Sequence, residues 1–190
     1  MKRIAIFASG SGSNAENITQ YFSENSDVAI DLVLTNKPKA GVIERANRLN
    51  LELLVFNREE FYTQNSITQL LLDRKIDLIV LAGFLWLIPN SLIQAFPKRI
   101  VNVHPALLPA YGGKGMYGHH VHEAVIRNAE KKSGITIHLV NEKYDEGEIL
   151  FQAEVDVLES DTSDTLASKI HQLEYSHFPK VIETYLNQLP

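Results

Sequence analysis

Short apolar segments that alternate with helix-like segments are the feature of this sequence that most constrains its fold. Between the apolar segments, hydrophobic residues recur at the three- and four-residue spacing of amphipathic helices. Because parallel strands need a crossover between them, this alternation predicts an α/β fold with a doubly wound, mostly parallel sheet. The strands predicted in this part of the chain cover residues 4–8, 31–35, 51–56, 77–84 and 100–104.

The C-terminal part of the chain follows a different pattern. Residues 134–141 and 149–157 both read as strands, and the acidic segment between them is too short for a helix. We therefore expect the later strand to pair antiparallel with the earlier one, which brings the sheet to about seven strands. The longer predicted helices cover residues 59–74, residues 119–132 and a terminal segment capped by Ser163 or Asp164.

Composition narrows the classes of protein to consider. The 190 residues suit one domain and contain no cysteine, which excludes disulfides and thiolate metal sites and fits a cytoplasmic protein. The net charge of −5 is spread along the chain and offers no basic surface for nucleic acid. No apolar run approaches the 18 or more residues that span a bilayer. We therefore expect small-molecule substrates, with no nucleic-acid or membrane partner.

Two polar residues interrupt the β-branched strand at 100–104. Asn102 and His104 are two positions apart, so their side chains lie on one face of the strand. Pro105 has no N–H group for the strand ladder, so the strand should end at His104. Ligand crevices of open α/β sheets form at the carboxyl ends of strands, which makes this pair a candidate for catalysis. A polar pair with only a structural role is an equally good interpretation.

The first predicted strand is followed by the glycine-rich turn Ser9–Asn14 and then by a helix over 15–22, for which Ser13 or Asn14 would be the N-cap. Glycines allow a tight turn, and the N–H groups at the start of a helix attract anions. Ala15 stands where a dinucleotide fingerprint prefers a third glycine, and no acidic residue ends the next strand. The pattern therefore favours a monophosphate, with a ligand-free tight turn as the alternative.

Two further segments suggest ligand contacts. Residues 85–88 are apolar beyond the end of the most hydrophobic strand, as in a pocket for a flat aromatic ligand or an ordinary core segment. Residues 112–118 contain four glycines and form a candidate lid beside His104. The histidines at 119, 120 and 122 diverge on a helix and have one nearby carboxylate, so we expect no metal site.

Four segments together resemble the folate-dependent formyltransferase superfamily, and the similarity extends over nearly the whole chain. They are I-V-N-V-H-P-A-L-L-P at 100–109, S-G-S-G-S-N at 9–14, L-A-G-F at 81–84 and D-E-G-E-I-L-F-Q at 145–152. The glycine turn points to the glycinamide branch of the superfamily. This resemblance implies a formyltransferase-like fold over residues 1–190, with a Rossmann-like phosphate-binding half at 1–100 and a folate and catalytic half at 101–190.

The resemblance also assigns roles to single residues. It implies that the catalytic residues are Asn102, His104 and Asp145. It implies that the substrate phosphate and glycinamide are bound by Gly12, Ser13, Asn14 and Glu174. It implies that the folate is bound by Arg58, Leu85, Trp86, Leu87, Ile88 and Asn102. The chain departs from the family pattern at Trp86, where many relatives carry a basic residue, and in the length of the 112–117 loop.

The activity implied by the resemblance is formyl transfer from 10-formyltetrahydrofolate to the amine of glycinamide ribonucleotide in purine synthesis, without a metal. In this mechanism Asn102 and protonated His104 donate to the oxyanion of a tetrahedral intermediate. Asp145 raises the pKa of His104 by its charge and helps to relay the proton through water. The resemblance is compatible with a monomer or a homodimer.

Three other functions share part of this pattern. A methionyl-tRNA formyltransferase would have the same three catalytic residues but is expected to carry a further nucleic-acid-binding domain. A formyltetrahydrofolate hydrolase would use water as the acceptor and is expected to carry a regulatory domain. A non-catalytic phosphate- or nucleotide-binding module would give Asn102, His104 and Asp145 no joint task. Their convergence near one point would argue against the last of these.

Overall fold

The computed structural model describes residues 1–189, which form seven strands and seven helices. The described chain divides into two compact units, one over residues 1–101 and one from residue 102 onward. The organisation of residues 1–190 as a single domain stays a prediction.

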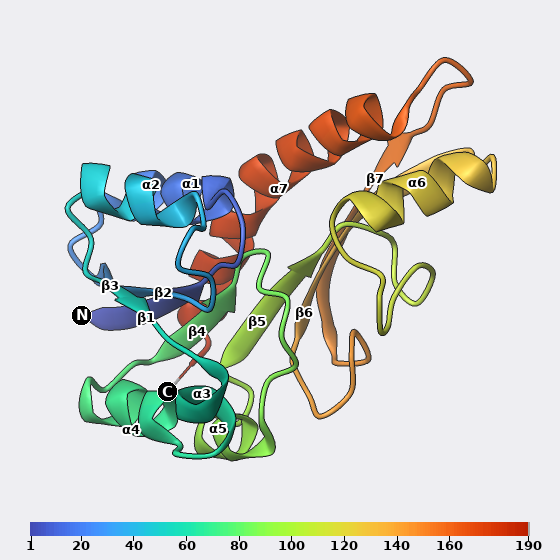
Figure 1. Ribbon diagram of the computed structural model, residues 1–190. Coiled ribbons are helices and arrows are strands. Elements are labelled where there is room, and N and C mark those ends of the chain that lie inside the picture. The colour runs from blue at the N-terminus through green and yellow to red at the C-terminus, as the bar shows by residue number, and fades with distance from the viewer. Residues whose placement is uncertain (190) are drawn as a thin grey trace. The chain divides into compact units, whose positions relative to one another are not determined.

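The first unit is a parallel sheet with helices on both faces. Its strands β1 (Lys2–Phe7), β2 (Val28–Thr35), β3 (Leu53–Val55) and β4 (Leu78–Leu81) lie in the order β3-β2-β1-β4. Its helices are α1 (Ser13–Phe22), α2 (Val42–Arg48), α3 (Arg58–Tyr62), α4 (Ser66–Asp73) and α5 (Asn90–Ala95). Figure 1 shows α1 and α2 on one side of these strands and α3 to α5 on the other. The predicted doubly wound parallel arrangement is confirmed for this unit.

Aliphatic strands and an aromatic cluster form the core of the first unit. Residues 4–7 of β1 and 78–80 of β4 are completely buried, as expected for strands covered on both faces. At the carboxyl end of β1, the ring of Phe7 packs against those of Phe56 and Phe84, with centroids 5.8 and 5.2 Å away. Burying each such side chain stabilises the fold by roughly 1.5–3 kcal/mol.

Two predictions about helix ends in this unit were wrong. The single helix expected over 59–74 is two helices, because a capping box at Asn57 starts α3 one residue earlier and Asn65 adopts a left-handed conformation (φ 54°) between α3 and α4. Neither Ser13 nor Asn14 caps α1, since both lie inside the helix and Gly12 is the N-cap. A glycine N-cap leaves the first turn without a side-chain cap.

The second unit combines a short sheet with two helices. The unit boundary falls within β5 (Ile100–His104), which is followed by α6 (His119–Arg127), β6 (Lys132–Leu139), β7 (Ile149–Asp156) and α7 (Ser163–Leu186). The strands lie in the order β5-β6-β7, and β6 pairs antiparallel with β7, as predicted. Helix α7 packs against α6 and both of these strands. Together, the seven strands confirm the predicted α/β fold class.

Helix ends in this unit also differ from the prediction. The N-cap of α7 is Thr162, not Ser163 or Asp164, because the Thr162 side chain accepts a hydrogen bond from the Thr165 N–H and forms a capping box. Helix α6 ends at Arg127 rather than near 132, because Ala129 adopts a left-handed conformation (φ 50°) and Lys132 pairs with β7.

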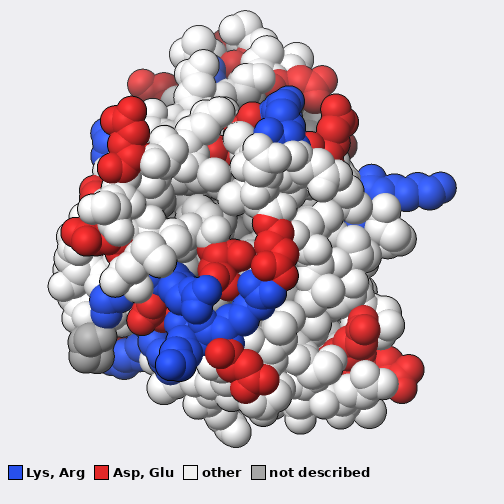
Figure 2. All heavy atoms as spheres, turned by 90° about the vertical axis from the view of Figure 1, so that its left-hand side faces the viewer, with Lys and Arg blue, Asp and Glu red and all other residues white. Residues whose placement is uncertain are grey.

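Charged side chains of the first unit pair with one another. The Asp31 carboxylate, on β2, lies 2.5 Å from the Arg3 guanidinium and 3.1 Å from that of Arg74, which also binds Glu52. Figure 2 shows lysine and arginine side chains beside aspartate and glutamate on the face that it presents. A mostly buried carboxylate is tolerated on β2 because two guanidinium groups offset its charge.

None of the described helices is both long and apolar enough to cross a membrane.

Candidate active site

The polar pair on β5 lies where the sequence predicts it. The strand ends at His104, which is 3 % exposed, and Asn102 is partly exposed on the same face. His104 Nε2 lies 2.7 Å from the backbone oxygen of Tyr111. A carbonyl oxygen can only accept, so Nε2 carries the proton and donates to it. In the neutral ring, Nδ1 is then the unprotonated nitrogen.

A second buried histidine joins the pair. His138 on β6 is 2 % exposed, and its Nδ1 lies 2.9 Å from the Leu139 carbonyl, to which it donates. In the neutral ring, its Nε2 therefore accepts from Asn102 Nδ2, at 3.0 Å. This hydrogen bond fixes the orientation of the Asn102 amide, because only its nitrogen can donate to Nε2.

Asp145 faces both histidines from the loop between β6 and β7. Its Oδ2 lies 3.6 Å from His104 Nδ1, and its Oδ1 lies 3.6 Å from His138 Nε2. Its Oδ2 also accepts a hydrogen bond of 2.9 Å from the Gly113 N–H. Asn102, His104 and Asp145 thus lie in one cluster, connected through His138.

Burial and charge oppose each other in this cluster. Burial lowers the pKa of His104, while the Asp145 charge and the Tyr111 carbonyl raise it; burial prevails and the pKa lies below its usual value. Burial raises the pKa of Asp145, but His138, His104 and the Gly113 N–H together lower it further. The Asp145 charge thus raises the pKa of His104, but less than burial lowers it. At neutral pH the carboxylate is charged and the imidazole neutral.

The glycine turn of the first unit precedes α1. Gly12 has φ 78°, a conformation that favours glycine, and an added Cβ would lie 2.5 Å from Val42 Cγ2 and 2.7 Å from Val42 Cα. The turn therefore packs directly on the start of α2. The neighbouring residues Ser13 and Asn14 begin α1, where backbone N–H groups point out of the helix end. This arrangement has the form of an anion site.

The residues predicted to bind folate surround an aromatic cluster of the first unit. The Arg58 guanidinium lies 4.9 Å from the centroid of the Trp86 ring, a cation–π contact. Hydrogen bonds between backbone groups and side chains hold the 85–88 segment. The Leu85 N–H donates to Ser9 Oγ at 3.1 Å, and the Leu87 carbonyl accepts from the Tyr62 hydroxyl at 2.8 Å. Leu85, Trp86 and Leu87 are partly exposed, whereas Ile88 is buried in the core.

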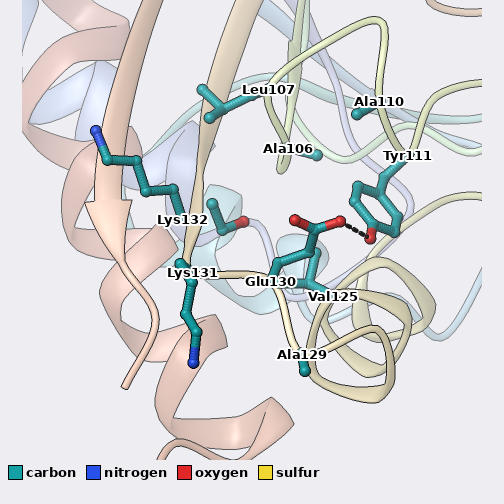
Figure 3. A pocket seen from close by; sticks show the side chains of 10 residues that line it. Ala106, Leu107, Ala110, Tyr111, Val125, Ala129, Glu130, Lys131 and Lys132 are labelled. Carbon is teal, nitrogen blue, oxygen red and sulfur yellow. Dashed lines mark hydrogen bonds between the residues drawn. The ribbon is translucent and has the colours of Figure 1, made fainter. Parts of the chain in front are cut away.

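A pocket in the second unit, of about 420 Å³, contains none of the predicted site residues. Figure 3 shows the Tyr111 hydroxyl hydrogen-bonded to Glu130 at its edge, with the lysine side chains turned away. Its lining residues are Ala106, Leu107, Ala110, Tyr111, Val125, Ala129, Glu130, Lys131, Lys132 and Ser133.

Glu174, predicted to contact glycinamide, is 6 % exposed on α7. Within residues 1–189, no group of three or more metal-ligating side chains could hold an ion.

Two residues of the cluster were not identified from the sequence as parts of the site. His138 is a polar residue within the predicted 134–141 strand, which is the only signal that the sequence offers for it. Tyr111 acts through its backbone carbonyl, which carries no sequence signature. The contact of His138 with Asn102 and that of the Tyr111 carbonyl with His104 form only in the folded chain, and neither follows from a local pattern.

Comparisons with known proteins point to one family. Residues 2–182 match the formyl transferase family. The chain is 42 % identical to a chloroplastic phosphoribosylglycinamide formyltransferase of Arabidopsis thaliana, over 95 % of this chain and 64 % of that protein. It is 37 % identical to phosphoribosylglycinamide formyltransferase of Bacillus subtilis, over 98 % of this chain and 95 % of that protein.

A solved structure shows the same fold. The crystal structure of phosphoribosylglycinamide formyltransferase from Bacillus halodurans superposes with a TM-score of 0.88 at 38 % identity, over 97 % of this chain and 95 % of that one. Sequence and fold lead to the same conclusion, and the chain belongs to the formyl transferase family.

Proposed function

We propose that the protein transfers a formyl group from 10-formyltetrahydrofolate to the amine of glycinamide ribonucleotide, a step of purine synthesis. The observation that carries this proposal is the cluster of Asn102, His104 and Asp145, since a binding module would have no use for buried titratable groups joined in this way. The names of the similar enzymes support phosphoribosylglycinamide as the acceptor and a formyl group as the group transferred, and the resemblance of the sequence motifs implies the folate donor.

In the first step, the neutral amine attacks the formyl carbon. A nitrogen–carbon bond forms, and the carbonyl becomes an oxyanion. One Asn102 N–H is directed to His138, so its second N–H is the one we assign to the oxyanion. His104 Nδ1 is the other candidate donor once it is protonated, because Nε2–H is directed to Tyr111. Each such donor is typically worth about 10²–10³ in rate.

His104 also moves the proton. Its lowered pKa leaves Nδ1 free of a proton at neutral pH, so it can accept the proton that the attacking nitrogen loses. The negative charge of Asp145, 3.6 Å away, stabilises the imidazolium that forms. The proton then passes to N10 of the folate as the bond between N10 and the formyl carbon breaks, directly or through water.

Substrate binding is assigned to separate groups of residues. The turn at Gly12, Ser13 and Asn14 would bind the phosphate, because helix N-termini favour anions. Glu174 would contact the glycinamide. The folate would bind to residues 85–88, with Arg58 pairing with its glutamate tail. No step of this reaction requires a metal, and we propose that the enzyme acts in the cytoplasm as a monomer or homodimer.

The test is ultraviolet detection of tetrahydrofolate formed from 10-formyltetrahydrofolate, with and without glycinamide ribonucleotide. Formation that depends on glycinamide ribonucleotide supports the proposal. Equal formation without it would identify a hydrolase and contradict the proposal. No product in either case, from folded protein that binds both ligands, would favour a binding module.

A further inference from the structure

One turn contacts both members of the His104–Asp145 pair. The backbone carbonyl of Tyr111 accepts the His104 Nε2–H at 2.7 Å, and two residues later the Gly113 N–H donates to Asp145 Oδ2 at 2.9 Å. The turn also lies close against Asp145, since a Cβ added to Gly112 would be 3.3 Å from the Asp145 Cβ. The position of this turn therefore sets the orientation of both side chains.

The side chain of Tyr111 anchors the turn at its other end. Its hydroxyl donates to Glu130 Oε1 at 2.7 Å and accepts from Asn128 Nδ2 at 2.9 Å. Asn128 is the C-cap of α6, and Glu130 lies in the short connection from α6 to β6. Burial and the acceptor Glu130 raise the pKa of the Tyr111 hydroxyl, so it remains a donor at neutral pH.

The backbone of the turn adopts a conformation that needs supporting contacts. Tyr111 has φ 57°, a left-handed conformation that costs free energy for any residue with a side chain, and two glycines follow it. Strained conformations persist where surrounding contacts over-determine them, and they gather at functional sites. Here the two hydrogen bonds of the Tyr111 hydroxyl and the contact of its carbonyl with His104 hold the strained residue at both ends.

We propose that Tyr111, anchored by Glu130 and Asn128, is a positioning residue that fixes the tautomer and orientation of His104 for formyl transfer. The Tyr111 carbonyl holds the proton on Nε2, and Nδ1 is thereby left toward Asp145 and the reacting atoms. This inference rests on the proposed function for its catalytic consequence. Its structural core, the link from the Tyr111 hydroxyl to the state of the His104 ring, can be measured without substrate.

Three other titratable groups face His104. Asp145 favours its protonated form, while His138 on β6 and His122 on α6 disfavour that form when they carry charge. His138 and His122 lie on a strand and a helix outside the turn, whereas Asp145 contacts the turn through the Gly113 N–H. A change in the titration of His104 in such variants therefore reports a displacement of the turn, and the tautomer ratio reports the Tyr111 carbonyl contact itself.

The experiment combines ¹⁵N NMR of the histidine rings in the ligand-free protein with formyl-transfer kinetics. In Tyr111→Phe we expect a larger fraction of the Nδ1–H tautomer of His104 and a lower pKa of that ring. We also expect kcat to fall about tenfold, below the roughly 10²-fold cost of a 1 Å misplacement, with KM for both substrates within about twofold of wild type.

Matched variants separate positioning from packing. Glu130→Ala removes the acceptor of the hydroxyl and should resemble Tyr111→Phe, whereas Glu130→Gln retains an acceptor oxygen and should restore the wild-type tautomer and kcat. Tyr21→Phe, at a 40 % exposed residue of α1, controls for the loss of a tyrosine hydroxyl elsewhere.

Thermal unfolding checks each variant, and Glu130→Ala tests the idea should Tyr111→Phe fail to fold. A wild-type His104 tautomer ratio and pKa in Glu130→Ala or folded Tyr111→Phe would overturn the proposal. Equal losses in Glu130→Gln and Glu130→Ala would overturn it too. If the tautomer shifts as expected but wild-type protein transfers no formyl group, the proposed function fails and the structural link stands.

Discussion

The two units of the chain differ in what they bury. In the first unit, the buried polar residues are uncharged, and the mostly buried Asp31 carboxylate is paired with two guanidinium groups; the uncharged residues are Ser9, Asn14, Thr35, Asn36 and Thr68. In the second unit, the buried side chains include four titratable groups among the described residues: His104, His122, His138 and Glu174. The first unit keeps its charges in ion pairs, such as Arg74 with Asp31, or at the surface.

This difference separates binding from chemistry. Burying an ionisable group costs free energy, because the charged form loses its hydration. In the second unit, ionisable groups are buried at the place where proton transfer is proposed. Burial lowers the pKa of His104 and so keeps its imidazole uncharged at neutral pH. The groups proposed to bind ligands in the first unit are backbone N–H groups, the 85–88 segment and an exposed guanidinium. Changes at His104 and Asp145 should therefore alter kcat and pH dependence, and changes at Gly12 and Arg58 should alter KM.

The largest effects are expected from the two proposed oxyanion donors. Asn102→Ala and His104→Ala should each lower kcat about 10²–10³-fold, because each removes a donor to the developing charge. The double variant should lose far less than the product of the two, since the groups act as a unit. Steady-state kinetics of folded variants provides the measurement. Multiplicative losses would contradict a shared role.

Replacing Asp145 should have the next largest effect. Asp145→Asn removes the charge that stabilises the His104 imidazolium, so we expect kcat to fall about 10²-fold. The pKa of His104 should fall further, which moves the acid limb of kcat/KM to lower pH. NMR titration of His104 and pH–rate profiles measure both. Wild-type kcat and pH profile in this variant would exclude the proposed mechanism.

Acid should destabilise the second unit through His122. Burial lowers the pKa of His122 to about 4. Because the unfolded chain binds this proton near pH 6.5, stability is present above that pH and is lost as the pH falls toward 4. The loss should reach about 2 kcal/mol by pH 5. Denaturant unfolding of His122→Gln should show a weaker pH dependence than wild type, with His120→Gln, at an exposed residue of the same helix, as the matched control.

The phosphate turn offers a matched pair of glycines. Gly12→Ala places a Cβ against the Val42 backbone at a positive φ, so KM for glycinamide ribonucleotide should rise about tenfold with little change in KM for the folate. Gly10→Ala meets no atom within 4 Å and should behave like wild type. If Gly12→Ala raised both KM values equally, the effect would reflect a general loss of structure.

The smallest effect is expected at Arg58. Its guanidinium is exposed and stacks on Trp86, so Arg58→Ala should raise KM for the folate about two- to fivefold and leave kcat unchanged. Trp86→Leu should produce a similar rise by releasing the guanidinium. An unchanged KM for the folate in Arg58→Ala would show that Arg58 does not bind the folate. A fall in kcat would contradict the expectation that changes at Arg58 alter only KM.

The sequence alone determined the features that depend on local pattern. The alternation of strands and helices fixed the parallel sheet of the first unit, because crossover connections leave few other topologies. Pro105 ended β5 at His104, since proline cannot continue the ladder. The short 142–148 connection required β7 to run antiparallel to β6. These outcomes follow from residues that are close together in the chain.

Only the tertiary structure decided the features that depend on distant contacts. The split of the predicted 59–74 helix depends on the left-handed Asn65, which a periodic pattern does not reveal. His138 bonds to Asn102 across 36 positions of the sequence, and the Tyr111 carbonyl has no side-chain signature. Burial lowers the pKa of His104 more than the Asp145 charge raises it. The direction of the net pKa shift therefore depends on how much solvent the folded chain excludes. Burial is a property of the whole fold, and no short motif encodes it.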